Sequence, residues 1–288
     1  MAKKKLAVAV IHGIGGQRKK PKSKPDTLHF SKPLRDRIAR EMKNARTSID
    51  FDTNIAWREV FWSDVIEKRQ QTYLGKIKRK TRSDAMRSFV LSNLSDASAY
   101  RKTTSDSNDT TYEKIHARVT RTIKTLERDV EPGAPLVVLA HSLGGHIMSN
   151  YIYDACKNCD KIDAEMGIKT DFQKMKTMGG FVTFGCNIPL FTFAYPAEKV
   201  FPISFPGTSL PKEKQLTPWW LNYYDKDDIL GYPLKEIGPN YNKLSKQLEE
   251  RPINAGNAFT SWNPLSHNGY WKDDDIYRPV ARFLAKFL

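Results

Sequence analysis

Apolar runs at five points of the chain predict the strands of a buried sheet. Leu6 to Ile11 and Leu136 to Leu139 are continuous apolar runs, which are typical of strands that are covered on both faces. Gly179 to Gly185 contains Phe-Val-Thr-Phe and has the same character. Ile55 to Trp62 alternates apolar and polar residues, and Trp219 to Tyr224 is rich in aromatic residues. We therefore interpret all five as strands.

Between these runs, apolar residues recur at helical spacing. One such pattern extends from Phe30 to about Arg46, a second spans Tyr112 to Val130, and a third starts at Ile147. A fourth, near the end of the chain, has an apolar stripe made of Ile276, Val280, Phe283, Leu284, Phe287 and Leu288. Strands that alternate with helices predict an α/β fold with a mainly parallel sheet flanked by helices. With 288 residues, the chain is expected to form a single domain, 1–288.

Two segments do not fit this alternation. Residues 63–111, with the basic stretch Lys76 to Arg82, predict a helical insertion in which Ser63 could cap the first helix. An insertion of this length is a candidate cap or lid, and a pair of surface helices with a solvated charged face is an equally good interpretation. Residues 194–218 form a Pro-rich excursion whose apolar side chains could line an acyl pocket or pack locally, namely Phe201, Ile203, Phe205 and Leu210.

The clearest chemical signal is Ala140-His141-Ser142-Leu143-Gly144-Gly145, directly after the second apolar run. A sharp strand-to-helix turn crowds a central serine, so small residues are needed two positions before and after it, here Ala140 and Gly144. Such a turn lifts the Ser142 hydroxyl clear of the sheet and points the Leu143 amide at a place where an oxyanion could be held. The sequence resembles the nucleophile elbow of lipases and esterases in the α/β-hydrolase superfamily. This resemblance implies the α/β-hydrolase fold, with Ser142 as nucleophile.

A glycine-rich turn follows the first strand, with the sequence His12-Gly13-Ile14-Gly15-Gly16-Gln17. Glycines there let the backbone come close to a ligand. In lipase-like hydrolases a His-Gly-x-Gly turn at this position carries the second oxyanion amide, and the resemblance implies the backbone amide of Ile14. The alternative is a phosphate-binding loop, but neither Lys-Ser nor Lys-Thr follows, and the Gly-x-Gly-x-x-Gly spacing is absent. We interpret His12 as packing behind the turn.

The same resemblance implies an acid and then a base after Ser142 in chain order. The acid is expected just past a later strand, where three aspartates follow Tyr224. Asp228 precedes apolar residues and resembles the acid-site pattern of several lipase families, and Asp225 is the second candidate. His267 is the one histidine beyond Asp228 and lies in a predicted loop before the final helix, so the resemblance implies that it is the base.

The two histidines that flank the serine have weaker claims. In a tight turn, the side chains next to the nucleophile are expected to point away from its reactive face. We therefore expect the rings of His141 and His146 to lie away from the site.

Composition indicates a globular chain. Hydrophobic residues make up 40% of it and aromatic residues 11%, which excludes an intrinsically disordered chain. No apolar stretch approaches the roughly 18 residues that a membrane-spanning helix requires. The three cysteines do not make a disulfide framework, and Cys156 and Cys159 lack the second pair that a zinc site needs, so a reducing cytoplasm fits best. The implied mechanism needs neither a metal nor a cofactor.

The net charge of +15 adds a second hypothesis. Such a charge favours anionic surfaces, of which a membrane is the candidate partner, and nucleic acid is not expected. We therefore expect a cytoplasmic protein that can associate peripherally with a membrane.

The favoured function is hydrolysis of a small-molecule or lipid carboxylic ester through an acyl-enzyme, with Ser142, His267 and Asp228 as the triad. The alternative is a catalytically inactive hydrolase-fold protein that binds an anionic membrane or nucleic acid through its basic surface.

Overall fold

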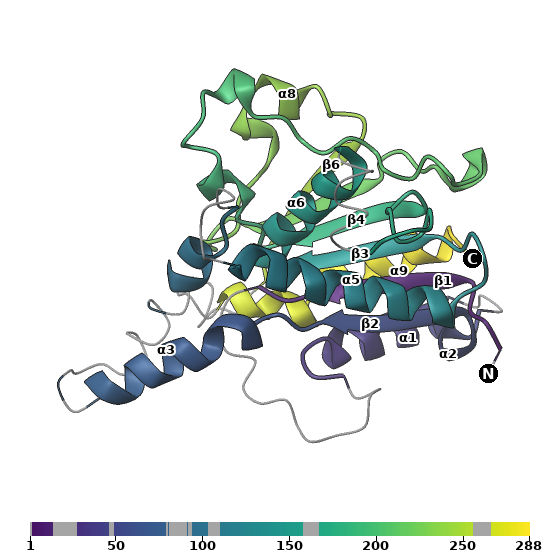
Figure 1. Ribbon diagram of the computed structural model, residues 1–288. Helices are drawn as coiled ribbons and strands as arrows, with labels where there is room; N and C mark the ends of the chain where they lie inside the picture. Colours follow the sequence, from purple (N-terminus) through teal and green to yellow (C-terminus); the bar gives the residue numbers. More distant parts are fainter. Residues whose placement is uncertain are drawn as a thin grey trace.

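The computed structural model describes residues 2–13, 28–45, 49–78, 80, 91, 94–102, 110–157, 167–255 and 266–288. Within these residues the chain forms one sheet of six parallel strands (Figure 1). Their order across the sheet is β2 (Ile55–Val60), β1 (Leu6–Ile11), β3 (Leu136–His141), β4 (Met178–Phe184), β5 (Trp220–Asp225) and β6 (Leu248–Ile253). The predicted parallel sheet is confirmed, and all five predicted strands belong to it.

The sixth strand, β6, is the one that the hydrophobic pattern does not predict. It lies at the edge of the sheet, next to β5, and its sequence is Leu-Glu-Glu-Arg-Pro-Ile. Leu248 is its one fully buried residue. Pro252 is tolerated because an edge strand has a side without a neighbour to accept its missing N–H. A polar edge strand of this kind carries no apolar run that could be recognised in the sequence.

Helices cover both faces of the sheet, so alternate residues of β1 point into two separate hydrophobic layers. The layer with α1 (Lys32–Asn44) and α9 (Asp274–Ala285) receives Leu6, Val8 and Val10. The layer with α5 (Thr111–Asp129) and α6 (Leu143–Lys157) receives Ala7, Ala9 and Ile11. Burial on both faces explains why β1 is apolar at every position. All four predicted helices are present.

The helix after Ser142 begins earlier than predicted. The spacing of apolar residues places its start at Ile147, whereas α6 begins at Leu143. Its first turn reads Leu-Gly-Gly-His, in which no apolar periodicity marks a helix. The short elements that connect the main helices and strands are α2 (Phe51–Asn54), α8 (Pro239–Asn242), η1 (Ile188–Phe191), η2 (Ala197–Lys199), η3 (Lys212–Lys214), η4 (Lys235–Ile237) and η5 (Ser266–Lys272).

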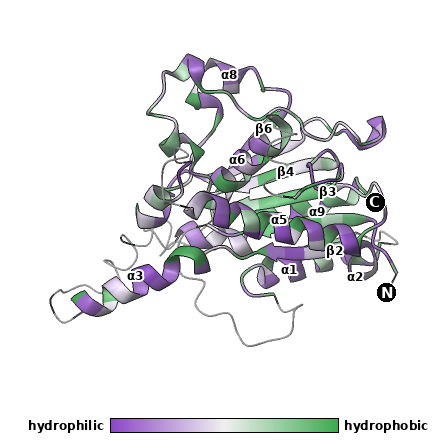
Figure 2. Ribbon diagram, viewed as in Figure 1, coloured by the Kyte–Doolittle hydropathy of each residue, from purple (hydrophilic) through white to green (hydrophobic). Residues whose placement is uncertain are grey.

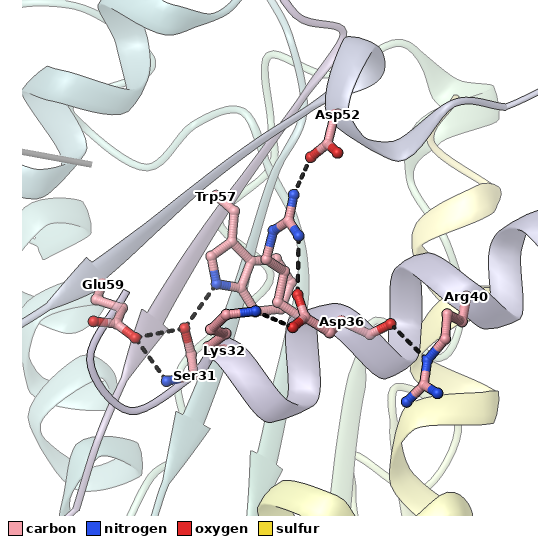
Figure 3. A network of polar contacts seen from close by, with 8 residues as sticks. Ser31, Lys32, Asp36, Arg40, Asp52, Trp57 and Glu59 are labelled. Carbon is pink, nitrogen blue, oxygen red and sulfur yellow. Dashed lines mark hydrogen bonds and ion pairs between the residues drawn. The ribbon is translucent and has the colours of Figure 1, made fainter. Parts of the chain in front are cut away.

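A carboxylate from β2 holds the N-terminus of α1. Ser31 is the N-cap residue but makes no capping bond through its side chain. Instead, Glu59 accepts the backbone N–H groups of His29 and Phe30 at 2.7 and 3.0 Å. It also accepts the backbone N–H and the hydroxyl of Ser31 at 2.6 and 2.7 Å (Figure 3). A negative charge is favourable at this end of a helix, where backbone N–H groups lack partners within the helix. Glu59 therefore ties the segment before α1 to the sheet.

Replacing Glu59 by alanine is expected to lower the free energy of unfolding by about 2 kcal/mol, because buried N–H groups would lose their acceptor. Phe30 is 6% exposed and Ser31 is fully buried, so water cannot replace that acceptor freely. Glu59→Gln keeps one carbonyl oxygen and should lose less. Urea denaturation followed by circular dichroism measures both variants. A Glu59→Ala variant as stable as the wild type would show that this cap has no energetic role.

The insertion at 63–111 starts with α3 (Asp64–Ile77), which projects away from the sheet (Figure 1). Most of α3 is hydrophilic (Figure 2), and Ile66 is its one buried residue. Ser63 is the N-cap residue, but its hydroxyl makes no capping bond, so the capping prediction for this side chain was wrong. Most of the second predicted helical patch, Met86 to Leu94, lies outside the described residues.

The apolar side chains of the excursion at 194–218 differ in burial. Ile203 and Leu210 are buried, and the ring centroid of Phe205 lies 5.5 Å from that of Trp219, whereas Phe201 is 68% exposed. Leu210 lies beside Gly179 at the start of β4. Gly179 lies at the end of the sheet where the strands start, whereas Ser142 lies at the end where they finish. Leu210 therefore packs locally. Among the helices that the structure describes, none is long and apolar enough to cross a membrane.

Candidate active site

Ser142 stands between β3 and α6 in a backbone conformation that residues other than glycine rarely adopt. Its φ is +55°, and the residue is fully buried. Its N–H donates to the Phe184 carbonyl of β4 at 3.0 Å, and its own carbonyl accepts from Gly145 at 2.9 Å. Such strain outside glycine is concentrated at functional sites, where the surrounding structure imposes it. The sharp turn predicted from the sequence is therefore present at Ser142.

Small residues surround the turn because other backbone segments come very close to it. A side chain at Gly13 would place its Cβ 2.2 Å from the Ser142 Cβ and 2.8 Å from its Oγ. A Cβ at Gly144 would lie 2.7 Å from the His12 carbonyl oxygen. Ala140 is fully buried and pairs with both Ile11 and Thr183. The sequence indicates the need for Ala140 and Gly144, but the contact between Gly13 and Ser142 joins two distant segments and has no local signal.

Asp228 and His267 form a buried pair at the end of the sheet that also carries Ser142. His267 lies in η5, and its Nδ1 is 2.8 Å from Asp228 Oδ2, on the turn after β5. Both residues are less than 5% exposed. The segment of His267 is thus a 3-10 helix and not the loop that the sequence predicts.

The surroundings of Asp228 keep its carboxylate ionised. Burial alone would raise the pKa of Asp228, but hydrogen bonds from His267, the Leu230 N–H and Tyr270, together with the charge of His267, lower it below its ordinary value. Since the folded-state pKa is the lower one, the ionised form stabilises the folded protein above the unfolded-state pKa, and this contribution is lost as the pH falls through the folded-state value. An ionised carboxylate only accepts hydrogen bonds, so His267 Nδ1 donates to it, and in the neutral form of the ring Nε2 is the acceptor.

Asp225, the second candidate acid, is occupied by backbone groups. Its Oδ1 accepts the Asp227 N–H at 2.8 Å, and its Oδ2 accepts the Ala255 N–H at 2.7 Å. These bonds fix the turn after β5 against the segment after β6. The geometry therefore favours Asp228 over Asp225 as the partner of His267.

Ser142 Oγ and His267 Nε2 share a property with five other side-chain atoms of the described residues. Each is a buried polar atom that has no hydrogen-bond partner among the described residues. His267 lies against Gly185, whose Cβ position is 3.3 Å from Nδ1, and Gly185 directly follows the residue that accepts the Ser142 N–H. The two side chains thus lie at the ends of the adjacent strands β3 and β4 without a bond to each other. Contacts of this kind are often long without substrate and tighten on binding.

Of the two backbone amides predicted to hold the oxyanion, the structure describes that of Leu143 but not that of Ile14. Leu143 is the first residue of α6, where backbone N–H groups lack partners within the helix. Ile14 lies outside the described residues. Most of the turn that His12 was expected to pack behind also lies outside the described residues. The His12 ring stacks on Trp62 with the centroids 5.2 Å apart, and its Nδ1 is 2.7 Å from the Gly13 carbonyl oxygen. Burial, only partly offset by that hydrogen bond, lowers the pKa of His12 to about 4, so it stays neutral.

The expected orientation of His141 was wrong. Its Nε2 donates to the carbonyl oxygen of His267 at 2.7 Å, and the two ring centroids are 4.7 Å apart. The residue before Ser142 therefore holds the backbone of His267 directly. His146 does lie away from this pair: its ring stacks on Phe191 at 4.0 Å, and burial lowers its pKa to about 3. His141 was missed because η5 returns to β3 from 126 residues away.

One acidic cluster could in principle hold a cation. Asp273, Asp274 and Asp275 bring carboxylate oxygens within 4.8 Å of one another. They lie at the start of α9, where Asp273 is the N-cap and accepts the Asp275 N–H at 2.9 Å. Helix capping and the helix dipole account for acidic residues there without a metal.

Comparison with known proteins gives distant structural likenesses. No family model and no curated protein matches the chain. The chain is similar to the carboxylesterase Cest-2923 from Lactobacillus plantarum WCFS1, with 11% identity, a TM-score of 0.40, and coverage of 98% of this chain and 84% of that one. It is also similar to a sugar hydrolase, YeeB, from Lactococcus lactis, with 14% identity, a TM-score of 0.32, and coverage of 99% and 90%.

The chain's own topology identifies its fold. The sheet is parallel throughout, helices cover both of its faces, and a serine at positive φ stands between the third strand in sequence and the helix that follows it. This combination of sheet and strained turn gives the chain the α/β-hydrolase fold.

Proposed function

We propose that the chain is a serine hydrolase that cleaves a carboxylic ester, with Ser142 as nucleophile, His267 as base and Asp228 as acid. The observation that carries the proposal is the pair of unsatisfied atoms. Burying a polar atom without a partner costs about 1–3 kcal/mol, so such atoms call for an explanation. Ser142 Oγ and His267 Nε2 are a nucleophile and a proton acceptor at the same end of the sheet. A substrate that closes the gap between them would give both atoms a role.

The proposed reaction begins with proton transfer. His267 Nε2 takes the hydroxyl proton as Ser142 Oγ attacks the ester carbonyl carbon, and Asp228 stabilises the imidazolium that forms. His267 then gives that proton to the leaving alcohol, and an acyl group remains on Ser142. Water attacks this acyl-enzyme with His267 as base, which releases the acid and restores the serine. The N–H groups of Leu143 and Ile14 are the proposed donors to the oxyanion of both tetrahedral intermediates.

The choice of acid is tested by replacing each aspartate with asparagine. Asp228→Asn is expected to lower kcat by about 10³–10⁴-fold, because an amide can no longer stabilise the imidazolium or fix the tautomer of His267. Asp225→Asn should lower kcat by less than about tenfold, since the bonds of Asp225 position a turn and do not reach His267. Steady-state kinetics on both purified variants measures the difference. A large loss in Asp225→Asn alone would reverse the assignment.

The insertion at 63–111 remains a candidate cap for this site. Its first helix follows Trp62, whose indole N–H donates to the His12 carbonyl oxygen at 3.0 Å. The His12 carbonyl is also the oxygen that lies against Gly144. The start of the insertion is thereby anchored beside the turn that carries Ser142.

The proposed function is tested with p-nitrophenyl acetate, butyrate and palmitate as substrates of the purified chain. We expect saturable hydrolysis of at least one of these esters, with detergent included for the longest.

The alternative function, binding of an anionic membrane without catalysis, has its own support in a groove of about 640 Å³ whose lining includes Lys102, Lys114, Arg121, Lys124 and Arg128. It predicts salt-dependent binding to anionic liposomes by a chain that hydrolyses none of the three esters.

A further inference from the structure

Tyr270 lies on the same face of η5 as His267. The 3-10 helix η5 spans Ser266–Lys272 and has about three residues per turn, so residues three apart in sequence lie directly above one another. Both side chains consequently reach the same atom. Asp228 Oδ2 is 2.8 Å from His267 Nδ1 and 2.8 Å from the Tyr270 hydroxyl oxygen. The carboxylate oxygen that holds the proposed base therefore has a second donor.

The direction of the tyrosine hydrogen bond follows from its other partner. The backbone N–H of Asp225 donates to the Tyr270 oxygen at 2.9 Å. An N–H group can only donate, so the single hydroxyl proton of Tyr270 is left for Asp228 Oδ2. Burial and the negative charge of Asp228 both raise the pKa of Tyr270, which keeps the hydroxyl protonated.

Two glycines make room for this arrangement. A Cβ at Gly231 would lie 2.5 Å from Asp228 Oδ2 and 3.0 Å from the Tyr270 oxygen. A Cβ at Gly185 would lie 2.8 Å from Tyr270 Cε2. Any side chain at either position would displace the carboxylate or the ring. The backbone around Asp228 is thus compatible with both donors at once.

We propose that Tyr270 is a positioning residue: it fixes the Asp228 carboxylate and limits how strongly that carboxylate favours the protonated form of His267. This inference rests on the proposed function. A hydrogen bond to an ionised oxygen disperses part of its charge. Without the hydroxyl, Asp228 would attract the imidazolium more strongly, and His267 would release its proton at a higher pH.

Other groups also surround the pair of His267 and Asp228. His141 donates to the His267 carbonyl from β3, and Asp225 faces Tyr270 from β5. Tyr232 feels the charge of Asp228 from the chain that follows the turn. Removing the hydroxyl also takes away the acceptor of the Asp225 N–H, but this backbone group carries no charge. A change in the titration of His267 therefore reports on the bond to Asp228.

The test compares Tyr270→Phe with the wild type and with Tyr151→Phe. The control removes a buried tyrosine hydroxyl as well, one that pairs with Thr120 Oγ1 at 3.1 Å between α6 and α5. We expect the acidic limb of the pH–rate profile to move up by roughly half a unit to one unit in Tyr270→Phe, and kcat on the plateau to fall about tenfold with little change in KM. Tyr151→Phe should keep the profile of the wild type.

A second readout separates this inference from the proposed function. The ring proton resonance of His267, followed by NMR during a pH titration, should show the same upward shift of its midpoint in Tyr270→Phe. If the wild type hydrolyses no ester, the proposed function fails, and the NMR titration still decides the role of Tyr270. An unchanged midpoint in both measurements, or a loss of kcat that is equal at every pH, would overturn the inference and leave Tyr270 with a structural role.

Discussion

Replacing Ser142 by alanine is expected to lower kcat for ester hydrolysis by about 10⁴–10⁶-fold, because no other group in the proposed mechanism can form the acyl-enzyme. The same change should not weaken the fold. The Ser142 hydroxyl has no hydrogen-bond partner among the described residues, so its removal breaks no bond and relieves a buried unsatisfied group. Thermal unfolding should show a Tm equal to or above that of the wild type.

Ser63→Ala is the matched control for this experiment. Ser63 is also buried, and its hydroxyl also lacks a partner within the described part of the chain. It follows β2 and has no place in the proposed mechanism. The control should therefore keep the activity of the wild type. Full activity in Ser142→Ala would remove the serine from the mechanism, whereas a comparable loss in both variants would point to a general effect of losing a buried hydroxyl.

Replacing His267 by alanine should lower kcat to a similar extent and, in contrast, weaken the fold. Without the imidazole, Ser142 has no base. Asp228 would also lose the hydrogen bond from His267 while its carboxylate stays buried, and such a loss typically costs about 1–3 kcal/mol or more for a charged group. Kinetics and urea denaturation of the same preparation measure both effects. A lower Tm for His267→Ala than for Ser142→Ala is the expected order.

His29→Ala provides the control for loss of a histidine. Its side chain is exposed, and its contact with Glu59 is made by its backbone N–H, which alanine retains. This variant should match the wild type in both activity and stability. If His267→Ala kept its activity while the control did as well, another group would have to serve as the base.

The sequence predicts the centre of the sheet well because burial leaves a direct mark there. β1, and β3 from Leu136 to Ala140, are apolar at every position since helices cover both of their faces. β6 escapes prediction because it is an edge strand that alternates little and carries three charged residues. The start of α6 also escapes prediction, because its first turn lies close to His12 and Cys186, which requires glycines instead of an amphipathic pattern.

The residues of the candidate site also differ in how well the sequence predicts them. Ser142 and His267 can be proposed from the sequence because a local turn and the order of residues mark them. Between Asp225 and Asp228, three positions apart, the sequence favours Asp228 through the apolar residues that follow it. In the structure, the difference is made by Ala255 and His267, which approach from segments that are distant in sequence. His141 and Tyr270 are found through hydrogen bonds across elements, so only the folded arrangement could show their contacts with His267 and Asp228.

The most direct test of the proposed mechanism is covalent labelling of the serine. The purified wild type is incubated with a fluorophosphonate probe, with and without detergent, and the modified residue is located by peptide mass spectrometry. We expect a single adduct on Ser142, which is absent in Ser142→Ala and forms far more slowly in His267→Ala. A correctly folded wild type that stays unlabelled under both conditions, or that carries its adduct on another residue, would contradict the assignment of Ser142 as the nucleophile.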